Sequence, residues 1–292
     1  MRKTVLVSVS GGRTSGYMAR WVQQNPEKVA EHIGADEVEL VFVFANTGME
    51  HPDTLRFLQD LDQHFQLGLV WLEGVTQFGQ RVATKHRVVD PRDAFSVTQW
   101  RDPEHPFHSY IRKYGIPNIK FIGCTREMKL NTMGSYMRSL GFQNMKTYYS
   151  AVGIREDEPR RVRKTADIHN IIYPLVDLEP VDKEDVLDWW SQFAWDLSIP
   201  EWLGNCVGCY KKSYKKLKLV QRDFPEAFEF TQGMEDQYGG PDSRTFFRLS
   251  TSTKNLLQSF AVVGGAEKYV RMNDAGCSES CEVYPTDEPT DA

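Results

Sequence analysis

The sequence predicts an α/β protein with a doubly wound, mainly parallel sheet, and three observations support this fold class. Short apolar runs of strand length occur at 5–9, 38–44 and 67–72. Between the last two, apolar residues such as Leu55 and Leu58 recur at helical spacing. Loops rich in Gly, Ser and Asn follow the first two runs. Such alternation forms a parallel sheet with right-handed crossovers, and its ligands bind at the carboxyl ends of the strands.

A loop of small residues joins the first expected strand to a helix expected over 17–22. The residues that we predict to bind phosphate are Ser10, Gly11, Gly12, Arg13, Thr14 and Ser15. Glycine permits positive φ angles and close backbone approach, so successive N–H groups and the helix N-terminus can surround an anion. The loop lacks the Gly-Lys-Ser/Thr ending of a Walker loop, which argues against a kinase or GTPase. The alternative is an ordinary strand–turn–helix corner.

The second expected strand, at 38–44, runs into the turn formed by residues 45–48, and a helix begins near His51. This turn should lie at the same sheet edge as the first loop, because parallel strands end together. At about 78–120 the apolar residues show no regular spacing, and we interpret this stretch as an inserted segment over the site.

The second half of the chain predicts a helix from Cys124, a strand over 146–152 that ends at Gly153, and a helix around 183–193. We therefore predict three parts. These are a nucleotide-binding domain at 1–200, a cysteine-containing and partly basic helical appendage at 201–281, and an acidic disordered tail at 282–292.

Composition indicates a globular protein outside the membrane. The 292 residues are 40% hydrophobic and 26% charged, with a net charge of -5. No apolar run is long enough to span a bilayer, and none near the N-terminus fits a signal peptide, so we expect a cytoplasmic protein with no membrane partner. Two basic clusters are solvated helix faces or, alternatively, contacts to nucleic acid. They consist of Arg160, Arg161, Arg163 and Lys164, and of Lys211, Lys212, Lys215, Lys216 and Lys218.

Four patterns, which include the loop and the turn described above, follow one another along the chain. They are Ser10-Gly-Gly-Arg-Thr-Ser15, Asn46-Thr-Gly-Met-Glu-His-Pro52, Gly153-Ile-Arg-Glu-Asp-Glu158, and Tyr173-Pro-Leu175 with a later Asp185-Val186. Through these motifs, over about residues 4–210, the chain resembles the phosphoadenosine phosphosulfate (PAPS) reductase family of the PP-loop nucleotide-binding superfamily. The resemblance implies a Rossmann-like PP-loop fold and an adenine nucleotide as ligand.

The resemblance also implies roles for individual residues. The loop at 10–15 would hold phosphate or sulfate, and Gly153 would let the backbone approach the nucleotide. Arg155 would clamp an anion and act in catalysis, with Glu158 holding Arg155 or Arg161 in place. The adenine or ribose would be bordered by Phe44, Asn46, Thr47 and Gly48. Thr14 stands where ATP pyrophosphatases of the superfamily carry Asp, which bears on whether magnesium accompanies the nucleotide.

Five cysteines predict a metal or redox site, and three interpretations stay open. Cys206 and Cys209 form a Cys-x-x-Cys pair in a Gly-containing turn, a spacing typical of metal ligands. Zinc could bind Cys206, Cys209, Cys277 and Cys281. Resemblance to the adenylylsulfate (APS) reductase branch and to related DNA phosphorothioation enzymes implies instead a [4Fe–4S] cluster on Cys124, Cys206 and Cys209. Its fourth ligand would be Cys277 or Cys281, or one iron would stay open to bind sulfur. Reduced thiols or a disulfide are the third interpretation. Cys281 is also the weak counterpart of the catalytic cysteine of PAPS reductases.

These observations predict an enzyme that acts at the phosphate end of an adenine nucleotide. In the first hypothesis, ATP activates an acceptor through its α-phosphate and sulfur transfer follows, with a nucleic acid or a sulfur carrier as acceptor. In the second, PAPS or APS is reduced to sulfite by a thiol. The third is a non-catalytic nucleotide- or nucleic-acid-binding module with a structural metal. A homodimer is the assembly considered.

Overall fold

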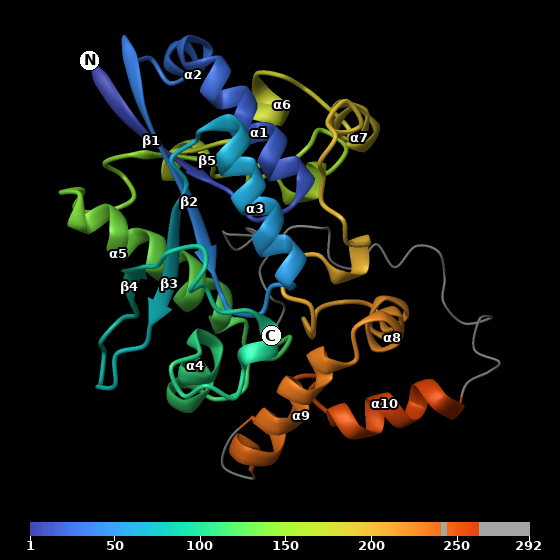
Figure 1. Cartoon of the computed structure of the whole chain (residues 1–292). Helices are drawn as coiled ribbons and strands as arrows, with labels where there is room; N and C mark the ends of the chain where they lie inside the picture. Colours follow the sequence, from blue (N-terminus) through green and yellow to red (C-terminus); the bar gives the residue numbers. More distant parts are fainter. Residues whose placement is uncertain (241–243, 263–292) are drawn as a thin grey trace.

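A six-stranded sheet forms the centre of the computed structural model, which describes residues 1–240 and 244–262 (Figure 1). Its strands lie in the order β4-β3-β2-β1-β5-β6. They are β1 (Arg2–Ser8), β2 (Glu37–Asn46), β3 (Val70–Val75), β4 (Lys85–Val88), β5 (Tyr149–Val152) and β6 (Ile171–Ile172). All neighbours pair in parallel except β3 and β4. The predicted α/β class and mainly parallel sheet are confirmed.

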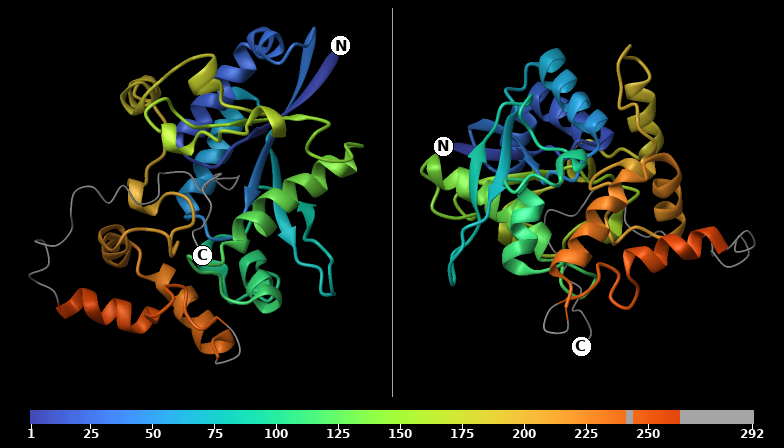
Figure 2. Two further views of the ribbon diagram at one scale, coloured as in Figure 1. Left: turned by 180° about the vertical axis from the view of Figure 1, so that it is seen from behind. Right: turned by 60° about the horizontal axis from the view of Figure 1, so that its bottom comes forward.

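Helices cover both faces of this sheet, as a doubly wound fold requires. Figure 1 shows α1 and α3 on one face, and the view from behind in Figure 2 shows α5 on the other. The α-helices are α1 (Arg13–Gln24), α2 (Pro26–His32), α3 (Pro52–Phe65), α4 (Pro106–Tyr114), α5 (Thr132–Ser139), α6 (Pro174–Asp177), α7 (Lys183–Trp190), α8 (Tyr214–Asp223), α9 (Glu226–Tyr238) and α10 (Thr253–Val262). A π-helix, η2 (Thr125–Asn131), leads into α5. Short 3-10 turns are η1 (Val97–Gln99), η3 (Pro159–Arg161), η4 (Asp167–His169) and η5 (Glu201–Leu203).

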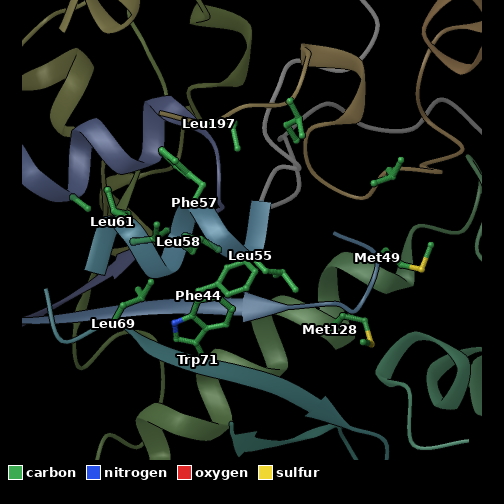
Figure 3. Packing of buried hydrophobic residues seen from close by; sticks show 14 of the residues in the cluster. Phe44, Met49, Leu55, Phe57, Leu58, Leu61, Leu69, Trp71, Met128 and Leu197 are labelled. Carbon is green, nitrogen blue, oxygen red and sulfur yellow. The ribbon is translucent and has the colours of Figure 1, made fainter. Parts of the chain in front are cut away.

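The core follows from the alternation of side chains along the strands. In β1, Val5 and Val7 belong to the large core cluster on the α3 face, whereas Leu6 packs in a separate cluster with Met133 and Met137 of α5. Figure 3 shows how the α3 face is filled, with leucines of the helix above aromatic residues of β2 and β3. The labelled residues of this layer include Leu55, Leu58, Leu61, Phe44 and Trp71.

The stretch at 78–120 contains regular structure that its sequence pattern did not predict. It forms β4, η1 and α4. Strand β4 pairs antiparallel with β3 at the sheet edge, and α4 contacts β3, η2 and α9. Because β4 is only four residues long and has no buried side chain, it shows no apolar period. The predicted inserted segment therefore contains an edge strand of the sheet and a helix that packs against β3.

The switch point of the sheet lies at its centre. The chain passes from β1 outward through β2 and β3, and then returns to place β5 on the other side of β1. Ligands of such sheets bind at the carboxyl ends of the strands beside this reversal. The loop at 10–15 follows β1, and the segment at 153–158 follows β5, so both lie there.

The chain after residue 200 forms η5, the turn with Cys206 and Cys209, and then α8, α9 and α10. Helix α9 contacts both α4 and η1. Cys277, Cys281 and the predicted acidic tail at 282–292 lie outside the described residues. Within 1–240 and 244–262, no helix combines the length and the apolar character that crossing a bilayer would need.

Candidate nucleotide site and cysteine pocket

The loop after β1 leaves the first amide groups of α1 available to a ligand. Gly12 is the N-cap residue, with φ -100° and ψ 159°, and no side chain caps the helix. The first turn of α1 contains no acidic residue. The first bond of the helix joins the Gly16 N–H to the Gly12 carbonyl at 3.0 Å. In the described part of the chain, the N–H groups of residues 12–15 have no hydrogen-bond acceptor. Amide donors that a helix N-terminus leaves without acceptors are able to hold an anion.

Internal hydrogen bonds hold this loop in shape. The N–H and the hydroxyl of Ser10 both donate to Ser15 Oγ at 3.0 Å, and the Ser15 hydroxyl donates to the Gly12 carbonyl at 2.9 Å. Gly11 has φ +85°, and a Cβ there would lie 2.6 Å from Thr54 Cγ2. Only glycine suits this position, because a side chain would be strained and would collide with α3.

The segment after β5 closes against the same loop. A Cβ on Gly153 would lie 3.1 Å from the Ser15 Cα, so the two backbones touch. The Arg155 Nη1 donates to Thr14 Oγ1 at 3.2 Å. Arg155 also forms an ion pair with Asp157 at 2.8 Å, and its side chain is 7% exposed. A guanidinium therefore lies beside the first turn of α1, where it can meet a bound anion.

Glu158 and Arg13 are engaged in ion pairs. Glu158 Oε1 accepts from Arg161 Nη1 at 2.7 Å and lies 3.8 Å from Arg155 Nη2. The Arg13 side chain donates to Asp196 at 2.8 Å and to the Leu197 carbonyl. The Arg13 side chain thus links the loop to the segment after α7, while its backbone N–H belongs to the uncapped first turn of α1.

The turn after β2 is built by buried polar contacts. Asn46 is fully buried, and its amide donates to Glu73 Oε1 and to the Phe95 carbonyl, both at 2.8 Å. Asn46 Oδ1 accepts from the Gly48 N–H at 3.1 Å. The buried Phe44 packs edge-on against Trp71, with ring centroids 5.0 Å apart. The side chains of Asn46 and Phe44 therefore support the turn from within the protein.

His105 sits under the same turn. Its Nε2 donates to the Gly48 carbonyl at 3.0 Å, and its Nδ1 accepts from the His108 N–H at 3.4 Å. Gly48 has φ +79°, and a Cβ there would lie 2.6 Å from the imidazole. Burial lowers the pKa of His105 to about 4. The imidazole is neutral at pH 7 and serves as a structural support.

This lowered pKa predicts that stability falls with acidity. The unfolded chain binds a proton at His105 near pH 6.5, whereas the folded chain does so only near pH 4. The contribution is complete above pH 6.5 and is lost as the pH falls to 4, by about 3 kcal/mol. We expect urea unfolding of a His105→Gln variant to show a smaller loss of stability between pH 7 and pH 4.5. If the variant loses as much unfolding free energy between pH 7 and pH 4.5 as the wild type, this role of His105 is contradicted.

Cys124, Cys206 and Cys209 line one pocket between η2, the Cys-x-x-Cys turn and α9. They come from segments far apart in sequence, so the fold brings together three predicted ligands. No disulfide joins these three to one another. Across the described ranges, no three His, Cys, Asp or Glu side chains form a ready group for a metal ion. The donor chemistry of the pocket nevertheless suits a sulfur-ligated group.

Tyr210 lines this pocket and Tyr110 lies against Gly123, next to Cys124; the sequence patterns indicated neither. Tyr210 Oη lies 3.5 Å from Cys124 Sγ. The buried Tyr110 hydroxyl has no hydrogen-bond partner in the part of the chain that is described, and a Cβ on Gly123 would lie 2.8 Å from it. Burial is the larger cause that raises the pKa of both phenols, and the nearby Cys124 adds to the shift. A buried hydroxyl that lacks a partner near Cys124 fits a bound group that would accept a hydrogen bond from it.

The turn after β2 contacts the Cys-x-x-Cys turn directly. Thr47 Oγ1 lies 3.4 Å from Cys206 Sγ and donates to the buried Glu50 carboxylate at 2.8 Å. The Val207 N–H donates to the Met49 carbonyl at 2.8 Å. Burial raises the pKa of Glu50, and the nearby Lys129 of η2 opposes that shift. Sequence analysis did not single out Glu50 or Lys129, although Glu50 lies inside the second motif.

The two basic clusters are only partly solvated. Arg160 and Lys164 are exposed, whereas Lys212 is buried. The prediction of a solvated helix face is wrong for Lys212, which precedes α8 and binds the loop around Cys206. Its ammonium donates, at 2.6 to 3.1 Å, to the carbonyls of Trp202, Gly204 and Val207.

Comparison with known proteins gives one relationship that covers nearly the whole chain. A protein of Escherichia phage lambda, named uncharacterized nin region protein ORF290, is 30% identical over 294 residues, which span 96% of this chain and 94% of that protein. The chain belongs to the family of this lambda protein. No family model matches the chain. The name of the lambda relative states no ligand or activity, so the chemistry of the ORF290 family is inferred from the loop and the pocket.

Proposed function

We propose that this protein is an adenine-nucleotide-dependent enzyme that acts at the phosphate end of its nucleotide, as its resemblance to PAPS reductases and PP-loop proteins implies. One observation carries the proposal. The amide groups of residues 12–15 have no acceptor among the described residues, and the Arg155 guanidinium lies beside them. Both elements stand at the carboxyl edge of the sheet next to its switch point. This is where α/β proteins bind nucleotides.

With ATP as ligand, the site would activate an acceptor through the α-phosphate. An acceptor oxygen attacks the α-phosphorus, the bond to the β-phosphate breaks, and pyrophosphate leaves with the bonding electrons. A sulfur nucleophile then forms a bond to the activated atom of the acceptor, and AMP leaves. The amides of the loop and Arg155 would stabilise the charge that develops on the leaving pyrophosphate. A nucleic acid or a sulfur carrier remains the proposed acceptor.

The three cysteines of the pocket are an argument for a sulfur-ligated metal centre in the same enzyme. Cys124 lies in the pocket with Cys206 and Cys209, which favours a [4Fe–4S] cluster on these three residues over a zinc site that omits Cys124. The fourth ligand would be Cys277 or Cys281; alternatively, one iron would have no protein ligand and could bind sulfur. When bound, such a cluster supplies electrons or an iron site for sulfur. Thr47, in the turn after β2, would lie beside this centre through its contact with Cys206.

A second candidate is thiol-dependent reduction of PAPS or APS to sulfite. The observation that favours it is the chemistry of the first turn of α1. Thr14 contacts Arg155, and the turn has no carboxylate that could hold magnesium beside a triphosphate. A sulfonucleotide needs no such ion. In this case Cys281 would be the nucleophile that attacks the sulfate sulfur.

Titration calorimetry with Mg·ATP, PAPS and APS separates these candidates. Binding of ATP with no heat from PAPS or APS is expected for the activation reaction. Tight binding of PAPS or APS with no affinity for ATP would assign the reduction instead. Absence of binding by all three nucleotides, at protein concentrations that detect a Kd of about 1 mM, would contradict the nucleotide site.

A further inference from the structure

Thr54 carries a hydroxyl that the folded protein leaves unsatisfied. It is the third residue of α3 and is 1% exposed. Its Oγ1 has no hydrogen-bond partner within residues 1–240 and 244–262. A buried hydroxyl without a partner costs about 1–3 kcal/mol, so such a group calls for an explanation.

The position of Thr54 points to the nucleotide loop. Its Cγ2 is the nearest atom to a Cβ built on Gly11, at 2.6 Å. The hydroxyl and the methyl group share the Cβ atom, and threonine in a helix uses two χ1 rotamers, so one rotation can turn Oγ1 toward the loop. The backbone N–H of Thr54 is already used, because it donates to the His51 carbonyl at 2.9 Å. The hydroxyl is therefore the donor of Thr54 that remains available to a ligand.

Two helix N-termini meet at this loop. The loop is the N-terminal turn of α1, and Thr54 lies in the first turn of α3. Both ends carry partial positive charge. Arg155 contacts the loop at Thr14, and Thr54 contacts it at Gly11, three residues earlier in the sequence. The Arg155 guanidinium therefore lies at one end of the loop. At the other end the Thr54 methyl group faces Gly11, and a rotation about χ1 would place the hydroxyl donor there.

From this arrangement we infer that the Thr54 hydroxyl binds the anionic end of the nucleotide. The inference rests on the proposed function and deepens it, because donors at both ends of the loop would suit a ligand with more than one adjacent anionic group. A diphosphate, a triphosphate and a phosphosulfate all belong to this class. The bound anion would supply the acceptor that the hydroxyl lacks in the free protein.

The test compares the wild-type protein with Thr54→Val and Thr54→Ser. Valine keeps the shape of threonine and removes only the hydroxyl. We expect Thr54→Val to weaken binding of ATP, or of PAPS if the wild type prefers it, by about tenfold or more, as loss of a hydrogen bond to a charged group implies. Without nucleotide, Thr54→Val should unfold at the same or a higher temperature. Thr54→Ser should bind within about threefold of the wild type, because it keeps the donor.

The outcomes separate this inference from the proposed function. Equal nucleotide affinity of Thr54→Val and wild type would overturn the role of Thr54 and leave the nucleotide site standing. A lower unfolding temperature of Thr54→Val would show that the hydroxyl serves the fold, and would also overturn it. If the wild type binds none of ATP, PAPS and APS, the proposed function fails and the inference fails with it.

Discussion

An aspartate in place of Gly12 is expected to abolish nucleotide binding while the protein stays folded. Gly12 has an extended conformation that any residue adopts, and a Cβ there would meet nothing closer than Ser10 Oγ at 3.9 Å. Aspartate is a somewhat better N-cap residue than glycine, so it should stabilise α1 by about a few tenths of a kcal/mol. Its carboxylate would occupy the place of the phosphate and accept from the same amides. Calorimetry should show no nucleotide binding, and thermal unfolding should show equal or higher stability.

A Gly12→Asn variant is the matched control. Asparagine has nearly the same size and caps a helix equally well, but it carries no charge. It should retain measurable binding, weakened by competition for the amides. If Gly12→Asp binds ATP or PAPS as tightly as the wild type, the anion does not lie at the N-terminus of α1 and the proposed site is wrong.

Replacement of Cys124 by alanine is expected to remove the metal centre. Protein purified without oxygen should be brown, with a broad visible absorbance band and bound iron, if Cys124, Cys206 and Cys209 hold an iron–sulfur cluster. Cys124→Ala removes one of the three ligands that share the pocket. We expect loss of most of the iron and of the visible band. The measurement is metal analysis with absorbance spectra on both proteins.

The zinc interpretation predicts a different result for the same variant. Zinc on Cys206, Cys209, Cys277 and Cys281 does not involve Cys124, so Cys124→Ala would keep one zinc per chain. A Cys206→Ala variant is the positive control, since it loses the metal under either interpretation. A colourless wild-type protein with bound zinc that survives Cys124→Ala would contradict the cluster.

Sequence patterns predict this fold well where burial dictates the residue types. The central strands β1 and β2 are apolar runs because both of their faces are covered, by α3 on one side and α5 on the other. Strand β3 extends from Val70 to Val75, three residues beyond its predicted end, and includes the buried Glu73, which pairs with Arg87. Strand β4 escaped prediction because it is short and none of its side chains is buried, so Lys85, His86 and Arg87 are polar and no apolar alternation marks it.

The candidate site was predictable where it depends on the backbone. Glycines at 11, 48 and 153 mark a positive φ angle or a close approach, and such needs leave a signal in the sequence. The directions of side chains leave no comparable signal. Asn46 pairs with Glu73 through contacts between separate strands, and Tyr110 meets the Cys124 region through the packing of α4. These contacts depend on the completed fold.

Hydrogen exchange measured with and without nucleotide tests the central claim most directly. A nucleotide bound at the N-terminus of α1 engages the amides of residues 12–15, which have no acceptor among the described residues. Saturating ATP or PAPS should therefore slow exchange in peptides that cover 10–16, 46–55 and 153–158, and the Gly12→Asp variant should show no such protection. Absence of protection in these peptides under conditions where nucleotide binds, or protection confined to another part of the chain, would contradict the account.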